Sequence, residues 1–199
     1  MNSIQWRSQL RQDRFVALMF EGRRDGYFVD IGAGHPEQIS NTVVLEREFG
    51  WRGILCDIEH ADALQRERAA ENAVLRDALL FQRSDWNASL GKIADDDGFI
   101  DFLSLDIEPP DATLEVMVRL PMDRFRFRIA MIEHDCYRDE NGPLRRELVR
   151  TYMAWRGYLL VCELGSASHG QIEDWYIHQE SGLTLEKARG VLKAMEMIA

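Results

Sequence analysis

Seven short, mostly apolar runs alternate with amphipathic segments along the chain, and this alternation restricts the fold more than any other feature. The runs cover residues 26–31, 53–58, 73–80, 100–106, 127–133, 157–163 and 172–178. Their length and their β-branched and aromatic residues are typical of β-strands. Strands that alternate with helices predict a largely parallel sheet with helices on both faces.

The segments between these runs carry helix signals. They cover residues 40–50, 60–72, 110–120 and 143–156. Ser40 suits an N-cap and Pro110 suits a first helical turn. The terminal segments 1–25 and 179–199 are also expected to be helical, whereas residues 81–99 are polar and turn-rich and are expected to form a surface excursion.

The last two predicted strands are separated by a very short link, "SASHGQIE". A crossover between parallel strands normally needs about a dozen residues or more, so these two strands should be antiparallel neighbours. We therefore expect a Rossmann-like α/β fold with a seven-stranded, mostly parallel sheet and an antiparallel final hairpin. It should form a single domain over residues 1–199, with the core at 26–178.

Charge and composition exclude several classes of partner. The net charge is -10, from 34 acidic and 24 basic side chains, which disfavours nucleic acid and anionic membrane surfaces. No apolar run approaches the roughly 20 residues of a membrane span, and Arg7, Arg11, Asp13 and Arg14 interrupt any signal-peptide pattern. A cytoplasmic location is expected. The charge run at 65–72 is expected to be an exposed helix face.

A glycine-rich turn follows the first predicted strand in "FVDIGAG". Ligands of open α/β sheets bind beyond the carboxyl ends of the strands, near the first strand. Gly32 and Gly34 would let backbone approach a ligand closely, and Asp30 carries a carboxylate that could act through the loop. A dinucleotide would require G-x-G-x-x-G, but Glu37 takes the place of the third glycine and its charge opposes a pyrophosphate.

An acidic residue, Asp57, follows the second predicted strand, 27 residues after Asp30. A carboxylate at this place can accept two hydrogen bonds from a ribose diol. Alternatively, Asp57 or Glu59 caps the next helix. The loop and the acid together favour a cofactor that carries adenosine.

Five motifs occur in order between residues 26 and 178: "YFVDIGAG", "SNTVVLEREFGWRG", "IDFLSLDIE", "IAMIEHD" and "IEDWYIH". Together they resemble the motifs of FkbM-type methyltransferases, and the second, at residues 40–53, is particularly specific. The resemblance implies a class I methyltransferase fold and binding of S-adenosylmethionine. For most of the family it also implies methylation of a hydroxyl oxygen on a carbohydrate or secondary-metabolite acceptor.

The resemblance also assigns residues to the cofactor. The cofactor-binding candidates are Asp30, Gly32, Gly34, Ser40, Asn41, Asp57 and Asp77. Asp57 would hold the ribose and Asp77 would face the adenine amine, while Ser40 and Asn41 either contact the cofactor or form an N-cap cluster. The family usually has Gly after its "LD-[VI]-E" motif, but this chain has Pro109 and Pro110, which stiffen the loop near the acceptor and leave its identity open.

Methyl transfer to a hydroxyl also requires a group that removes a proton. The catalytic candidates are Asp106, Glu133 and His134, which follow or end two neighbouring strands and should therefore lie close together. His134 suits a general base because imidazole titrates near neutral pH. The carboxylates and the imidazole could instead hold Mg²⁺, which would orient the acceptor, or they could form a solvated acidic rim.

The leading hypothesis is thus an S-adenosylmethionine-dependent O-methyltransferase with a small hydroxylated acceptor. A second hypothesis is a non-catalytic module that keeps the fold and binds a ligand or a partner. A nucleotide-binding oxidoreductase is disfavoured by Glu37. A homo-oligomer is possible, because the apolar face of the C-terminal helix could pack on the sheet or on a second subunit.

Overall fold

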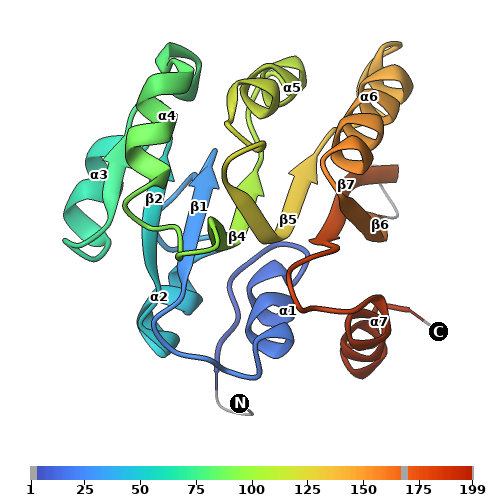
Figure 1. Cartoon of the computed structure of the whole chain (residues 1–199), viewed down its shortest axis with the longest axis horizontal. Coiled ribbons are helices and arrows are strands. Elements are labelled where there is room, and N and C mark those ends of the chain that lie inside the picture. Colours follow the sequence, from blue (N-terminus) through green and yellow to red (C-terminus); the bar gives the residue numbers. More distant parts are fainter. Residues whose placement is uncertain (1–3, 167–169, 199) are drawn as a thin grey trace.

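The computed structural model describes residues 4–166 and 170–198. The chain forms one sheet with the strand order β3-β2-β1-β4-β5-β7-β6 (Figure 1). The strands are β1 (Tyr27–Ile31), β2 (Arg52–Cys56), β3 (Ala73–Leu75), β4 (Phe99–Leu105), β5 (Arg126–Glu133), β6 (Tyr158–Ser166) and β7 (Gly170–His178). The pairings among β1 to β5 are parallel, and β7 is antiparallel to both β5 and β6. This confirms the predicted sheet and its final hairpin, although residues 167–169 of the link lie outside the described residues.

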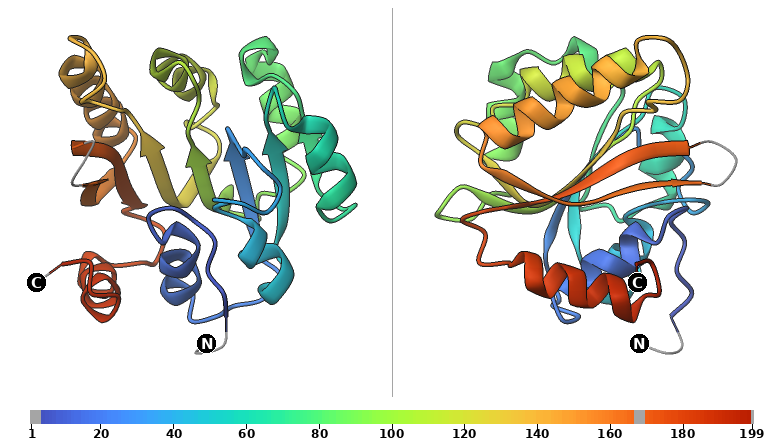
Figure 2. Two further views of the ribbon diagram at one scale, coloured as in Figure 1. Left: turned by 180° about the vertical axis from the view of Figure 1, so that it is seen from behind. Right: turned by 90° about the vertical axis from the view of Figure 1, so that its right-hand side faces the viewer.

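Helices cover both faces of the sheet, as predicted. They are α1 (Gln12–Met19), α2 (Val43–Phe49), α3 (Ala61–Glu67), α4 (Arg83–Leu90), α5 (Pro110–Arg119), α6 (Gly142–Trp155) and α7 (Leu185–Ala194), with a 3₁₀ turn η1 (Ala78–Leu80). Figure 2 shows α4, α5 and α6 on one face, and α1, α2 and α7 on the other.

Alternating side chains of the strands supply two separate cores. In β1, Val29 and Ile31 enter the core beneath α4, α5 and α6, whereas Phe28 enters the core that α1, α2 and α7 cover. Successive side chains of a strand point to opposite faces, so a strand in a doubly covered sheet is apolar at nearly every position. This is why the strands could be recognised as continuous apolar runs.

The third strand is shorter than the predicted range of 73–80. It ends at Leu75, and the following residues form η1. The carboxylate of Asp77 accepts a hydrogen bond from the backbone N–H of Leu79 at 2.8 Å and so begins this turn. The local capping interaction therefore ends the strand, even though apolar residues continue beyond it.

The expected surface excursion at 81–99 is wrong in part, because it contains α4. The helix begins with a capping box in which the N–H of Gln82 donates to Asp85 Oδ2 at 2.8 Å. Trp86 and Leu90, one turn apart, are both fully buried in the core beneath α4, α5 and α6. Two buried residues in a polar helix are too few to produce a clear apolar pattern.

The burial of α4 can be tested with two leucines. Leu90→Ala should lower the free energy of unfolding by about 2 to 5 kcal/mol, because it leaves a cavity in the core. Leu80→Ala, at a side chain that is 75% exposed, should change it by less than about 0.5 kcal/mol. Urea denaturation followed by circular dichroism measures both, and equal effects would contradict the packing of α4.

The two terminal helices pack against each other on one face of the sheet. Phe15 of α1 and Leu192 of α7 are fully buried in the same core, and the Arg11 guanidinium donates to the backbone O of Met195 at 2.6 Å. The apolar face of α7 therefore packs on its own chain. In the described part of the chain, no helix has the length and apolar character needed to cross a membrane.

Candidate cofactor and active site

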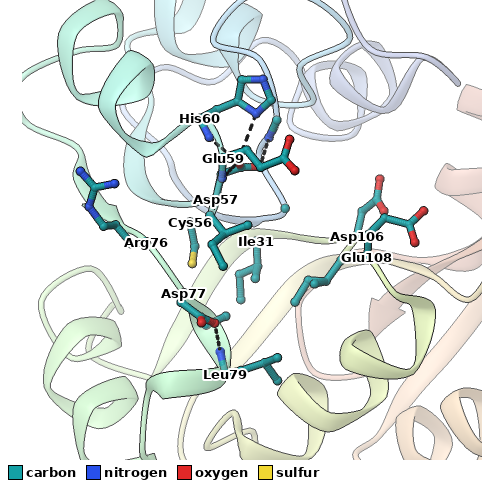
Figure 3. A pocket seen from close by; sticks show the side chains of 15 residues that line it. Ile31, Cys56, Asp57, Glu59, His60, Arg76, Asp77, Leu79, Asp106 and Glu108 are labelled. Carbon is teal, nitrogen blue, oxygen red and sulfur yellow. Dashed lines mark hydrogen bonds and ion pairs between the residues drawn. The ribbon is translucent and has the colours of Figure 1, made fainter.

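A cavity of about 390 Å³ lies at the carboxyl ends of β1, β2 and β4 (Figure 3). From β1 the sheet continues to β2 and β3 on one side and to β4 and β5 on the other, so chain order reverses at β1 and β4. Such a reversal leaves a crevice above the sheet and is the usual ligand site of open α/β folds. The cavity is therefore where the strand order predicts it.

The glycine loop after β1 follows a path that requires glycine at Gly32. Its φ is +82°, and a Cβ there would lie 1.5 Å from the backbone O of Asp106. Its N–H donates to the backbone O of Cys56 at 2.8 Å, which ties the loop to β2. Gly34 has a φ of +61°, and a Cβ there would meet no described atom within 4 Å. Gly34 thus borders open space at the cavity.

The two glycines should respond differently to alanine. Gly34→Ala should destabilise the fold by about 1 to 2 kcal/mol, the cost of a left-handed conformation. Gly32→Ala should cost roughly 3 kcal/mol or more, because overpacking against Asp106 is added to that strain. Denaturant unfolding measures the difference, and a Gly32→Ala variant as stable as Gly34→Ala would contradict the close approach of the loop to β4.

Asp57 holds the glycine loop and borders the cavity. Its Oδ2 accepts from the N–H of Gly34 at 2.8 Å, and its Oδ1 accepts from the N–H groups of Glu59 and His60 at 2.9 and 2.7 Å. Asp57 therefore caps the turn before α3, as one of the two interpretations of the sequence expected. A carboxylate has about four acceptor positions, so Oδ2 can still accept a hydrogen bond from a ligand.

Asp77 lies on the same wall of the cavity as Arg76 (Figure 3). One of its carboxylate oxygens caps η1 through Leu79, and Arg76 forms an ion pair with Asp62 of α3. Across Ile31, Asp106 and Glu108 line the opposite wall. The cavity therefore joins the two ends of the predicted site, with Asp57 and Asp77 at one end and Asp106 at the other.

Asp30, Ser40 and Asn41 lie behind the loop, and none of them is among the described residues that line the cavity. Asp30 is buried, which raises the pKa of its carboxyl, and its Oδ2 accepts from the Thr42 hydroxyl at 2.7 Å. Ser40 Oγ accepts from the N–H of Val43 at 3.2 Å, and the Asn41 amide donates to Ser104 Oγ at 2.9 Å. The N-cap of α2 is Thr42, whose side chain does not cap the helix, so the N-cap interpretation holds only in part, through the contact of Ser40 with the first N–H of α2.

A buried ion pair lies next to these residues, and it was not predicted from the sequence. The Arg68 guanidinium is fully buried and donates to Glu46 Oε2 at 3.0 Å and to the Thr42 hydroxyl at 3.2 Å. The expected exposed helix face at 65–72 is therefore wrong for Arg68. Its partners lie more than 20 residues away in the sequence, and no local pattern marks the pairing.

Asp106 and Glu133 form a carboxyl pair at the carboxyl ends of β4 and β5, with a hydrogen bond between their side chains. Burial raises the pKa of Asp106 to about 6. Burial, together with the nearby charge of Asp106, raises the pKa of Glu133 to about 11. At neutral pH Glu133 therefore keeps its proton and donates to an ionised Asp106, since two close carboxylates do not both ionise readily.

His134 does not join this pair. Its side chain is fully buried, and its Nε2 lies 3.5 Å from Asp174 Oδ1, which Arg150 also contacts at 2.9 Å. Arg150 belongs to α6, whereas the side chain of Glu133 shares its strand face with residues that α1 covers. Adjacent residues at the end of a strand point to opposite faces, so the expected cluster of all three candidates does not form.

The described residues contain no group of three or more His, Cys, Asp or Glu side chains arranged to hold a metal ion. The expectation of bound Mg²⁺ therefore has no support in the geometry of the site.

No family model and no curated protein matches the chain. Solved structures do. A protein of the NADB-Rossmann superfamily from Streptococcus agalactiae is 12% identical, with a TM-score of 0.52 over 98% of this chain and 80% of that one. A protein from Klebsiella pneumoniae, provisionally assigned as an O-methyltransferase, is 14% identical, with a TM-score of 0.55 over 84% and 80%. The METTL16 methyltransferase domain is 9% identical, with a TM-score of 0.53 over 85% and 65%.

At these identities the likeness concerns the fold. The chain has the Rossmann-like methyltransferase fold, with the predicted seven-stranded sheet. The similarity to FkbM-type enzymes remains one of sequence motifs, because no family model matches.

Proposed function

We propose that this protein is an S-adenosylmethionine-dependent methyltransferase that methylates a hydroxyl oxygen of a small carbohydrate or secondary-metabolite acceptor. The observation that carries the proposal is the cavity at the switch point, which connects the open glycine loop and Asp57 with the buried carboxyl pair at Asp106. Its volume of about 390 Å³ is within the usual range of small-molecule sites.

Three parts of the cofactor have a matching group in the cavity: the ribose, the adenine and the sulfonium. Asp57 Oδ2 would accept a hydrogen bond from a ribose hydroxyl while it holds Gly34. Ile58 and Leu79 offer apolar surface to the adenine, and Asp77 would accept from its amine. The carboxylates of the cavity also attract a sulfonium cation, which S-adenosylmethionine carries when bound.

The carboxyl pair supplies the proton acceptor. S-adenosylmethionine would supply the methyl group to the acceptor oxygen and leave as S-adenosylhomocysteine, and Asp106 would take the proton of the hydroxyl group. An acid with its pKa raised to about 6 is a stronger base than an ordinary aspartate and is still ionised at neutral pH. Glu133 donates to Asp106 and holds its carboxylate in place.

The alternative is a non-catalytic module with the same fold. The carboxyl pair favours an enzyme, because buried groups with strongly shifted pKa values in a cleft are typical of active sites. Cofactor binding without turnover over a broad panel of hydroxylated acceptors would favour the module.

Cofactor binding can be tested at Asp57. Asp57→Ala should weaken binding of S-adenosylmethionine by about 1.5 to 3 kcal/mol, the loss of one hydrogen bond to a charged group. Asp96→Ala, at an exposed aspartate that does not line the cavity, is the matched control and should leave the affinity unchanged. Calorimetry measures both, and a wild-type protein that does not bind the cofactor would contradict the proposal.

The proton acceptor can be tested by turnover of labelled cofactor. Asp106→Asn should lower turnover about 10²-fold or more with little change in cofactor affinity, since a base acts in the transition state. Wild-type turnover should rise as the pH increases through about 6, where Asp106 loses its proton. His134→Gln is the comparison: if it abolishes turnover and Asp106→Asn does not, His134 is the base.

A further inference from the structure

The carboxylate of Asp57 has most of its acceptor positions filled by its own chain. Its Oδ1 accepts from the backbone N–H groups of Glu59 and His60 at 2.9 and 2.7 Å, and His60 Nδ1 lies 3.2 Å from the same oxygen. Its Oδ2 accepts from the N–H of Gly34 at 2.8 Å. Because a carboxylate oxygen has about two acceptor positions, Oδ1 is saturated and Oδ2 has one position left. Asp57 can therefore accept a single hydrogen bond from a ligand.

The ribose of an adenosine cofactor carries two hydroxyl groups on adjacent carbons. With a single acceptor position, Asp57 alone leaves one of these hydroxyls without a partner in the protein. A hydroxyl that leaves water without gaining a hydrogen bond costs binding free energy. A site that holds the ribose firmly needs a second acceptor beside Asp57.

Glu59 provides such an acceptor. It lines the cavity two residues after Asp57, and Figure 3 shows the two side chains together at one end of the cavity. Within residues 4–166 and 170–198, no hydrogen bond or ion pair engages the Glu59 carboxylate. The other carboxylates of the cavity wall each have a partner in the chain: Asp57, Asp77, Asp106 and Glu108.

We propose that Asp57 and Glu59 divide the ribose diol between them, each accepting from one hydroxyl group, so that Glu59 is a specificity-determining residue for the cofactor. The inference rests on the proposed binding of S-adenosylmethionine. A site built to hydrogen-bond a hydroxyl group rejects an analogue that lacks it. With an acceptor for each hydroxyl, the cavity selects a ribonucleoside over both of its deoxy forms.

The test is calorimetry with S-adenosylhomocysteine and with its 2′-deoxy and 3′-deoxy forms. The wild type should bind each deoxy form about tenfold or more weakly than the parent compound, because one hydrogen bond to a charged group is lost. In Glu59→Ala, one of the two deoxy forms should bind as tightly as the parent, while the other stays about tenfold weaker. Alanine keeps the backbone N–H that donates to Asp57, so the first acceptor remains in place.

Two further variants are matched to Glu59→Ala. Glu67→Ala changes an exposed glutamate of α3 that does not line the cavity, and it should leave the wild-type pattern unchanged. Glu59→Gln keeps an acceptor oxygen and should retain part of the sensitivity to both hydroxyls. A Glu59→Gln protein that behaves like Glu59→Ala would contradict a direct hydrogen bond and overturn the inference.

5′-Methylthioadenosine separates the ribose from the amino-acid end of the cofactor, which it lacks. Glu59→Ala should weaken its binding as much as that of S-adenosylhomocysteine. A loss confined to S-adenosylhomocysteine would assign Glu59 to the amino-acid end, and a Glu59→Ala protein that rejects both deoxy forms as the wild type does would show no role in the diol. Either result overturns this inference alone. A wild type that binds none of these compounds contradicts the proposed function, and the inference with it.

Discussion

Main-chain contacts at the end of β1 hold the whole site in register. The N–H of Gly32 donates to Cys56 of β2, and the N–H of Asp106 donates to the backbone O of Ile31 at 2.9 Å. Three strand ends are thus joined at one point, with the Gly32 Cα against the Asp106 carbonyl. This junction, which tolerates no side chain at Gly32, sets the positions of the cavity, of Asp57 and of the Asp106–Glu133 pair.

The sequence predicted the sheet well because its strands are buried on both sides and are apolar at nearly every position. It predicted that Gly32, Gly34 and Asp57 meet at the ligand edge of the sheet, because they are adjacent to strand ends that the pattern located. A pattern of neighbouring residues cannot predict contacts between residues far apart in the sequence, such as the ion pair of Arg68 with Glu46. It also did not predict the burial of two residues in the polar helix α4. The separation of His134 from Glu133 could have been found, since counting by two along β5 places them on opposite faces.

Several acidic side chains lie at the edge of the sheet where the parallel strands end, and they fall into two groups. Asp57 and Asp77 accept hydrogen bonds from backbone N–H groups. Both also border the cavity, where their carboxylates can accept hydrogen bonds from a ligand. Asp106 and Glu133 are buried next to each other, and a proton shared between them relieves their repulsion. The same residue types thus provide fixed charge at one end of the cavity and proton exchange at the other.

The packing of α1 has a consequence for the order in which the chain folds. Phe15 of α1 packs against Trp175 with the two rings tilted and their centroids 4.7 Å apart, and the same core includes Ala188, Leu192 and Met195. These partners follow Phe15 by 160 to 180 residues in the sequence (175 − 15 and 195 − 15), and synthesis adds only about 5 to 20 residues per second. The apolar face of α1 therefore stays without these partners for roughly ten seconds or more during synthesis, and in that time it is a natural binding site for a chaperone.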